Sequence, residues 1–125
     1  MENRKLGRLG EEIALRYLLK TKHVIIERNF KKKFGEIDII ARSIDGMLIF
    51  CEVKTMAFGD SAQMNIFKPS DRINFKKIQH MRRMARFYSL KNSSLVFDIG
   101  WRIDAISVFI KSEHKADVVH FKNIA

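Results

Sequence analysis

The sequence contains one cysteine, one proline and no long hydrophobic run. A single cysteine excludes a disulfide framework and a zinc site built from cysteines. One proline and six glycines exclude a collagen-like or proline-rich chain. No apolar run approaches the ~18 residues needed to cross a bilayer, and the charged first ten residues lack the apolar core of a signal peptide. We therefore expect a soluble cytoplasmic protein with no membrane partner.

Length and charge narrow the class of protein further. A length of 125 residues predicts one domain, residues 1–125, with a hydrophobic core large enough to be stable without disulfide bonds. The net charge is +10, and acidic residues outnumber basic ones only in residues 36–70. Basic segments favour phosphate binding, whereas gathered carboxylates favour Mg²⁺ or Mn²⁺. The alternative is a soluble protein that is basic without a specific partner.

Hydrophobic periodicity predicts an α/β fold, with helices packed on a sheet. Apolar residues at helical spacing predict amphipathic helices over 3–21 and from Ser70 or Asp71 to about Leu90. Residues 56–69 read as a surface loop. β-branched and apolar runs predict strands over residues 24–26, 36–41, 47–55, 95–99, 102–110 and 117–121.

The strands over 36–41 and 47–55 bring two carboxylates together. Glu52 and Lys54 are two residues apart on a strand, so they project from the same face. A three-residue hairpin loop over 44–46, with Gly46 in the left-handed conformation, aligns Asp38 directly opposite Glu52. Their Cβ atoms would then lie ~5 Å apart. The alternative is an ordinary Glu52–Lys54 ion pair with Asp38 at a strand end.

Two carboxylates in this position need a counter-charge. At an effective dielectric near 20 their repulsion is roughly 3–4 kcal/mol, which a divalent cation or a proton relieves. Glu11, at the edge of the apolar stripe of the first helix, is a further candidate for the cluster. Gly7 and Ala14 are small and would let that edge of the helix approach the sheet closely. The alternative for Glu11 is a surface carboxylate.

Several segments of the chain match one known family in order and spacing. They are residues 7–11 (GRLGE), 35–41 (GEIDIIA), 50–54 (FCEVK), 102–104 (RID) and 120–123 (HFKN). With these motifs the chain resembles the YraN-type family of small bacterial proteins. That family looks like a branch of the restriction-endonuclease-like superfamily, with the signature PD-(D/E)xK, and is similar to archaeal Holliday-junction resolvases.

The resemblance implies an αβββαβ core with a mixed central sheet flanked by helices. It implies a Mg²⁺ or Mn²⁺ cofactor held by Asp38, Glu52 and the Val53 carbonyl. Lys54 would activate the attacking water or stabilise the phosphate, and Glu11 would complete the acidic cluster. The implied reaction is hydrolysis of phosphodiester bonds in DNA, including branched or structured DNA, and a homodimer is implied by similarity to the resolvases.

Basic side chains on or near the second helix, before the strand over 36–41 and at the start of the strand over 102–110 are candidates for nucleic-acid binding. They are Lys31, Lys32, Lys33, Arg72, Lys76, Lys77, Arg83, Arg86 and Arg102. The alternative for these residues is a solvated face. The four histidines lack metal-ligand spacing and are interpreted as surface or packing residues, and Cys51 as a small buried hydrophobe.

Three hypotheses follow from these residues. The first is a Mg²⁺-dependent nuclease. The second is a nucleic-acid-binding protein on a nuclease fold with little or no catalysis. The third is an interaction protein in which the acidic cluster is a buried ion-pair network.

Overall fold

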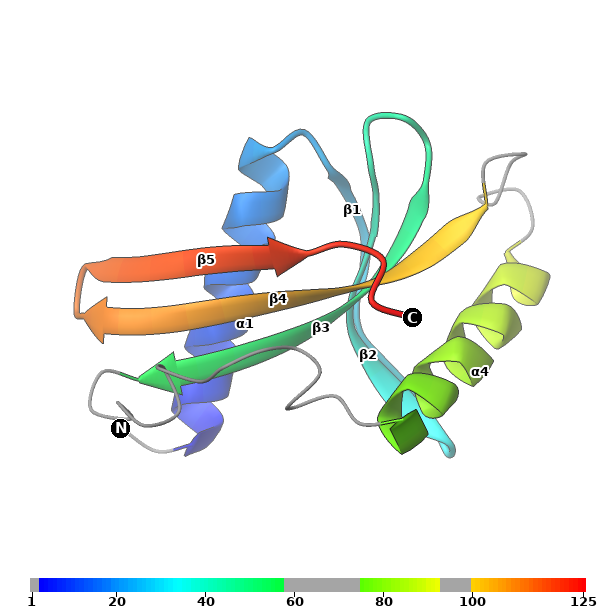
Figure 1. The fold of residues 1–125 in the computed structure, drawn as a ribbon, viewed down its shortest axis with the longest axis horizontal. Helices are drawn as coiled ribbons and strands as arrows, with labels where there is room; N and C mark the ends of the chain where they lie inside the picture. The colour runs from blue at the N-terminus through cyan, green and yellow to red at the C-terminus, as the bar shows by residue number, and fades with distance from the viewer. Residues whose placement is uncertain (1–2, 58–74, 93–99) are drawn as a thin grey trace.

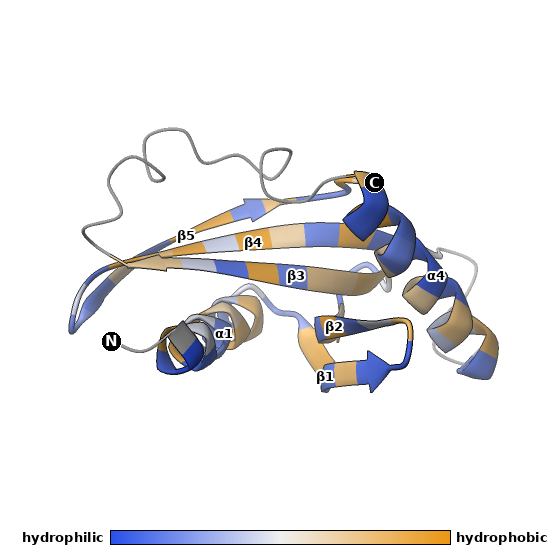
Figure 2. Cartoon of the chain, turned by 90° about the horizontal axis from the view of Figure 1, so that it is seen from below, coloured by the Kyte–Doolittle hydropathy of each residue, from blue (hydrophilic) through white to orange (hydrophobic). Residues whose placement is uncertain are grey.

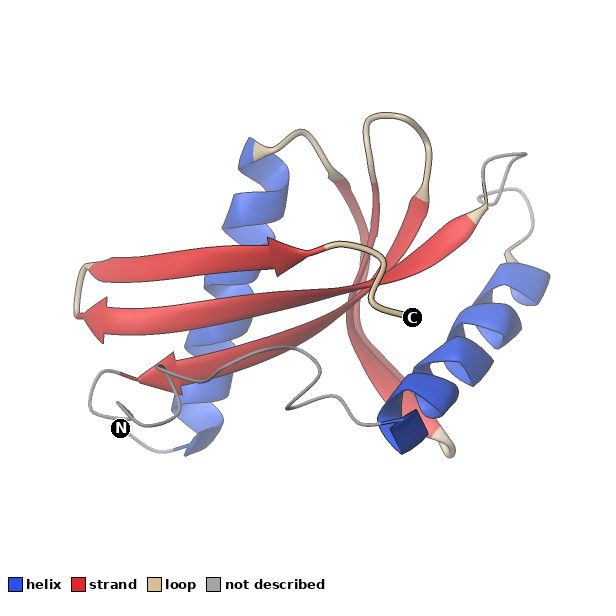
Figure 3. Ribbon diagram, viewed as in Figure 1, coloured by secondary structure: helices blue, strands red, loops and turns tan. Residues whose placement is uncertain are grey.

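The structure, a computed structural model, describes residues 3–57, 75–92 and 100–125. The elements are α1 (Asn3–Lys20), β1 (Val24–Lys32), β2 (Gly35–Arg42), β3 (Leu48–Ala57), α4 (Phe75–Lys91), β4 (Trp101–Ser112) and β5 (Lys115–Phe121) (Figure 1; Figure 3). This order confirms the predicted α/β fold and is consistent with the restriction-endonuclease-like core. In the described ranges no helix is both long and apolar enough to span a membrane.

The strands form one mixed sheet in the order β1-β2-β3-β4-β5. Among the described strands, the β3–β4 pair alone is parallel, and the other neighbours are antiparallel. Alternate residues of β3 serve opposite faces: Cys51 packs in a cluster with Leu18 of α1, whereas Phe50 packs with Met81 and Tyr88 of α4. The two helices therefore cover opposite faces of the sheet, with α1 below β3 in Figure 2.

The hairpin between β2 and β3 has the predicted loop. The Ser43 N–H donates to the Met47 carbonyl at 2.9 Å, which closes a loop over residues 44–46. Gly46 has φ +93°, a left-handed conformation that favours glycine. The strands then pair from Arg42 with Leu48 to Ile39 with Cys51, which is the register expected from the sequence.

Several predicted boundaries differ from the structure. The strand predicted over 24–26 continues to Lys32 because it pairs with β2 along its length, even though Asn29 has φ +52°. Met56 is buried in β3, beside Phe109 of β4, and does not belong to the predicted loop. The remaining loop residues, the start of the second helix and the predicted strand over 95–99 lie outside the described residues.

Of the two glycines of α1, Gly10 is the one that lies close against the sheet, and Gly7 does not. A Cβ atom at Gly10 would overlap the Thr55 side chain of β3, whereas a Cβ at Gly7 would meet no atom within 4 Å. Gly10 lies on the line of Ala14 and Leu18, both fully buried, whereas Leu9 is 37% exposed. The predicted close approach of α1 to the sheet is therefore present, but it occurs at Gly10 and the prediction of Gly7 as its site is wrong.

We predict that Gly10→Ala destabilises the protein. Alanine has the higher helix propensity, by ~1 kcal/mol, but the overlap with Thr55 costs about 1–3 kcal/mol and pushes α1 away from β3. The urea midpoint of Gly10→Ala should fall, and Thr55→Ala in the same chain should restore part of the loss. The matched control is Gly7→Ala on the same helix, which should be neutral or stabilising; an equal loss there would contradict the prediction.

Candidate functional site

The candidate site lies at a fork between β2 and β3. Their pairing ends at Ile39 and Cys51, although β2 begins at Gly35 and β3 continues to Ala57. Beyond that point β2 pairs only with β1, and β3 only with β4. In Figure 1 the β1–β2 hairpin turns away from the common direction of β3, β4 and β5. The fork therefore opens a space between two central strands, where backbone groups no longer meet.

Asp38 and Glu52 lie one residue beyond the last pair, so the predicted register holds up to them, but the expected direct pairing of these two residues does not form. Oδ2 of Asp38 accepts a hydrogen bond from the Val53 N–H at 2.8 Å, so the side chain bridges the opening strands. Burial and the nearby Glu52 carboxylate raise the pKa of Asp38 to about 7, against the lowering effect of that hydrogen bond. The structure thus holds an acidic group whose ionisation is costly in the absence of a cation.

Glu52 is buried and ion-paired with two lysines. Its Oε1 atom lies 3.3 Å from the Lys54 Nζ atom and 3.6 Å from the Lys77 Nζ atom. The Glu52 side chain is only 7% exposed, while those of Lys54 and Lys77 are 33% and 40% exposed. Lys77, predicted to contact nucleic acid, therefore reaches from α4 into the fork and adds a second ammonium group to the expected Glu52–Lys54 pair.

Glu11 enters the same site from α1. Burial raises the pKa of Glu11, with further contributions from Glu36 and Glu52, while Arg28 lowers it. Oε1 of Glu11 is buried and has no hydrogen-bond partner among the described residues. A carboxylate oxygen in that position is costly unless a cation or a donor meets it. Glu11 is therefore part of the acidic cluster and not an isolated surface carboxylate.

These groups line one cavity of about 410 Å³. It is formed by α1, β2, β3 and α4, and its walls include Glu11, Asp38, Glu52 and Lys77. Glu36 also lines it, although the sequence analysis did not select this residue. The signal was present, because Glu36 lies two residues before Asp38 on the same strand and so shares its face.

The donor set fits a hard divalent cation in chemistry but is not assembled as a cage. Carboxylate and carbonyl oxygens are the ligands that Mg²⁺ prefers, and the partnerless Glu11 oxygen and the raised Asp38 pKa both indicate an excess of negative charge. Among the described residues, however, no three carboxylate, imidazole or thiolate groups are close enough together to hold a metal ion. In this arrangement the ammonium groups of Lys54 and Lys77 balance the charge of Glu52.

The other basic candidates lie on several surfaces. Lys31, Lys32, Lys33, Lys76, Arg83 and Arg86 are exposed, and Arg72 lies outside the described residues. Arg102 differs, because its side chain is only 17% exposed and forms an ion pair with Asp104 at 2.9 Å. Together with Arg82 and Arg86 it lines a smaller cavity beside Trp101.

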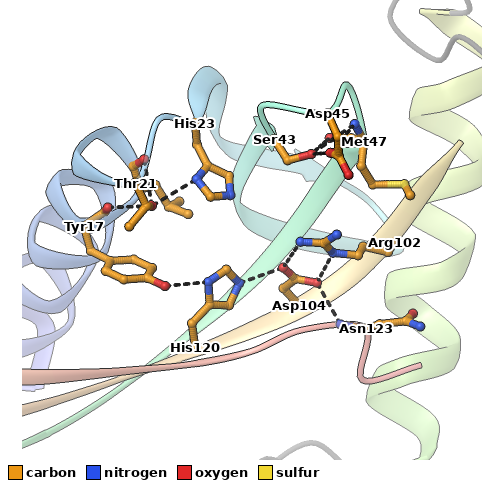
Figure 4. Close-up of polar contacts among 11 residues, drawn as sticks. Tyr17, Thr21, His23, Ser43, Asp45, Met47, Arg102, Asp104, His120 and Asn123 are labelled. Carbon is orange, nitrogen blue, oxygen red and sulfur yellow. Dashed lines mark hydrogen bonds and ion pairs between the residues drawn. The ribbon is translucent and has the colours of Figure 1, made fainter. Parts of the chain in front are cut away.

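A second buried polar network, which the sequence analysis missed, involves Asp104 (Figure 4). Its carboxylate accepts hydrogen bonds from Arg102 Nε at 2.9 Å, His120 Nε2 at 2.7 Å and the Asn123 N–H at 2.9 Å. Because the Nε2 atom of His120 donates to a carboxylate, its Nδ1 atom in the neutral ring accepts from the Tyr17 hydroxyl, at 2.8 Å. The motifs over 102–104 and 120–123 thus contact each other through Asp104 and His120, and His120 links them to Tyr17 of α1.

The charge of Asp104 is stabilised by these partners. Burial alone would raise the pKa of Asp104, but its hydrogen bonds with His120, Arg102 and the Asn123 N–H outweigh burial and hold the pKa below its usual value. The side chains of Asp104 and His120 are 0% and 4% exposed. This network ties α1, β4 and the segment after β5 together, so His120 has a packing role of a more specific kind than the sequence indicated.

Comparison with known proteins gives consistent matches over nearly the whole chain. The model of "Uncharacterised protein family UPF0102" matches residues 10–108. A UPF0102 protein of Dictyoglomus turgidum is 34% identical over 122 residues, covering 98% of this chain and 95% of that protein. One from Alkaliphilus oremlandii is 35% identical over 121 residues, covering 97% of each chain. One from Clostridioides difficile is 36% identical over 110 residues, covering 88% of this chain and 90% of its own.

We predict that Asp38→Asn stabilises the metal-free protein at alkaline pH. The unfolded chain ionises Asp38 above about pH 4, whereas the folded protein resists ionisation until about pH 7, so ionisation of Asp38 reduces stability as pH rises between these values. Asparagine cannot ionise but keeps an oxygen for the Val53 N–H. In urea denaturation with EDTA, Asp38→Asn should exceed wild type at about pH 8, and the difference should shrink toward about pH 5.

The control for this prediction is Asp45→Asn in the β2–β3 loop. A hydrogen bond from the Ser43 hydroxyl holds the pKa of Asp45 below its usual value, so ionisation of Asp45 favours the folded state. Asp45→Asn should therefore bring no gain at alkaline pH. A gain for both variants, or a pH-independent gain for Asp38→Asn, would contradict the assigned cause.

We also predict that Asp104→Asn is strongly destabilising. It removes the charge that Arg102 pairs with in a buried network, a change that typically costs about 3–5 kcal/mol. The matched control is Asp117→Asn, which breaks the exposed pair with Lys111 and should cost less than ~1 kcal/mol. Equal urea midpoints for the two variants would show that the Asp104 network contributes no more than a surface pair.

Proposed function

This chain belongs to the uncharacterised protein family UPF0102, and from that premise we propose that it is a metal-dependent nuclease that hydrolyses phosphodiester bonds in DNA. The match confirms the resemblance to YraN-type proteins. The family's name assigns no reaction, so the proposal rests on residues. The observation that carries it is the fork between β2 and β3, into which Glu11, Asp38, Glu52 and two lysines converge from four elements.

Asp38, Glu52 and the Val53 carbonyl would hold Mg²⁺ or Mn²⁺. When bound, such an ion supplies Lewis acidity at the phosphate and lowers the pKa of a coordinated water. Asp38 is suited to the role because burial and the Glu52 carboxylate raise its pKa. A bound cation would relieve the cost of ionising it. Glu11, with a buried oxygen that lacks a partner among the described residues, would accept a proton or a hydrogen bond from water on the α1 side.

Lys54 and Lys77 would act on the phosphate and on the attacking water. Both ammonium groups lie within 3.6 Å of the same Glu52 oxygen. Beside a metal ion held by Glu52, these ammonium groups would be placed to donate to substrate oxygens. A lysine held beside the reacting phosphate stabilises the negative charge that develops there. Lys54, which follows Glu52 on the same face of β3, is the candidate for orienting the water.

The exposed basic residues would bind the remaining phosphates of the substrate. Lys76, Arg83 and Arg86 lie on the exposed side of α4, the helix that also carries Lys77. Each duplex phosphate that they neutralise steepens the salt dependence of binding by ~0.9. Branched or structured DNA in the cytoplasm is the proposed substrate, and a homodimer would present two forks to two strands of one branch.

A second candidate function is nucleic-acid binding with little or no catalysis. One observation favours it: Glu52 is already neutralised by two lysines, and no three ligand groups of the described residues form a metal cage. A protein of this kind would use the same basic surface and would bind DNA without metal. The two candidates differ in what the carboxylates do, so a variant test separates them.

We predict that wild type binds Mg²⁺ or Mn²⁺ in calorimetry and cleaves one of a set of branched, nicked and single-stranded DNAs. Asp38→Asn and Glu52→Gln should each lower cleavage by on the order of 100-fold or more, because even partners of metal ligands are worth 10–100-fold. The matched control is Glu12→Gln, since Glu12 neighbours Glu11 on α1 but forms an ion pair with Arg28 at 2.6 Å.

The outcomes separate the two candidate functions. Cleavage at the wild-type rate in Asp38→Asn and in Glu52→Gln would contradict the nuclease proposal. Salt-dependent DNA binding that needs no metal and persists in both variants, without cleavage by wild type, would instead favour the binding protein.

A further inference from the structure

A group of aromatic rings lies where α4 packs against the β1–β2 hairpin. Phe30 contacts Tyr88 edge-on with ring centroids 5.0 Å apart, and Phe34 contacts Phe87 in the same manner at 5.6 Å. Phe30, Phe34 and Phe87 are only partly buried. Phe30, Phe87 and Tyr88 line a cavity of about 270 Å³ that is distinct from the cavity of the fork and also has Glu27 in its wall. Part of this aromatic surface is therefore open to a ligand.

Cations surround these rings. Nζ of Lys32 lies 5.5 Å from the Phe30 centroid and 5.4 Å from that of Phe87, and Nζ of Lys91 lies 5.6 Å from Phe87. The Arg83 guanidinium lies 4.5 Å from the Phe34 centroid. Within the described part of the chain, none of the three cations forms an ion pair. Their charges are therefore available to an anionic group.

We propose that this cavity binds an unpaired nucleobase, with the flanking phosphates on Lys32 and Lys91. Proteins that bind single-stranded nucleic acid combine aromatic rings, on which bases stack, with basic groups that follow the backbone. The two ammonium groups outnumber the single Glu27 carboxylate in the cavity wall, so the cavity favours an anionic ligand over a cationic one, and a purely apolar ligand would leave the ammonium groups without a partner. The inference rests on the proposed function, because it assigns to the same protein the strand state of its nucleic-acid substrate.

The position of the cavity relates it to the fork. Lys77 and Phe87 are ten residues apart on α4, which corresponds to about 15 Å along the helix. Even at the ~3.4 Å rise of one strand in duplex DNA, this distance spans only about four nucleotides. One strand can therefore place a phosphate at the fork and an unpaired base on Phe87. A base inside a duplex is stacked and paired, so the geometry selects DNA that is single-stranded or splayed near the reacting phosphate.

The test compares single-stranded and duplex DNA of the same sequence by fluorescence anisotropy in EDTA, so that no cleavage is needed. Wild type should bind the single strand more tightly. Phe87→Leu keeps an apolar side chain but removes the ring, and should lower the single-strand affinity by about 5-fold or more, the loss typical of one stacked base. The ratio of single-strand to duplex affinity should fall with it.

The matched control is Phe75→Leu, which removes a 77% exposed ring from the same helix outside the cavity. It should leave the affinity ratio at the wild-type value. An unchanged ratio in Phe87→Leu, or an equal fall in Phe75→Leu, would overturn the inference. Competition by a free mononucleotide as strong as that by the oligonucleotide would also overturn it, since the site would then serve a small molecule.

A second variant guards against a folding defect in Phe87→Leu. Lys91 is exposed at the end of α4, so Lys91→Gln should fold normally and reduce the salt slope of single-strand binding by ~0.7. An unchanged slope would overturn the phosphate contact. If wild type cleaves DNA with metal but Phe87→Leu keeps the wild-type affinity ratio, the nucleobase site is wrong and the nuclease proposal is supported. If the affinity ratio falls in Phe87→Leu but wild type cleaves DNA with neither Mg²⁺ nor Mn²⁺, the nuclease proposal is wrong and the nucleobase site is supported.

Discussion

The candidate site depends on the separation of β2 from β3 beyond Ile39 and Cys51. Where two central strands part, backbone donors need new partners, and the Asp38 carboxylate supplies one by accepting from the Val53 N–H. The same separation admits side chains from α1 and α4 on opposite faces of the sheet, so Glu11 and Lys77 line one cavity. A continuous β2–β3 ladder would keep these two faces apart.

Both helices are positioned by contacts at some distance from the carboxylates. Gly10 lets α1 lie against Thr55 of β3, which sets how far Glu11 can reach. Met81 and Tyr88 anchor α4 on the other face, and the helix then extends Lys77 toward Glu52. The site is thus built by packing on two faces and by one opening between strands. The raised pKa values of Glu11 and Asp38 indicate that ionising these two carboxylates reduces the stability of the folded protein.

The contacts of the Asp104 network could not be predicted from the sequence, because they join residues that lie far apart along the chain. Asp104 and His120 are separated by 16 residues, and Tyr17 and His120 by 103, so no spacing rule connects them. The motifs that contain Asp104 and His120 were visible, but nothing local indicated that they meet. Lys77 is a similar case, because a lysine on a basic helix is typical of a solvated face, and only the packing of α4 directs it to a carboxylate.

By itself the sequence determined the order of the described helices and strands, the loop over 44–46 with Gly46, and the β2–β3 register from Arg42–Leu48 to Ile39–Cys51. These features depend on side-chain alternation and turn geometry, which act between residues close along the chain. Tertiary structure alone decided where β2 and β3 part, which glycine of α1 meets β3, and which lysines reach Glu52. Those outcomes depend on packing between distant elements, and the raised pKa of Asp38 follows from that burial.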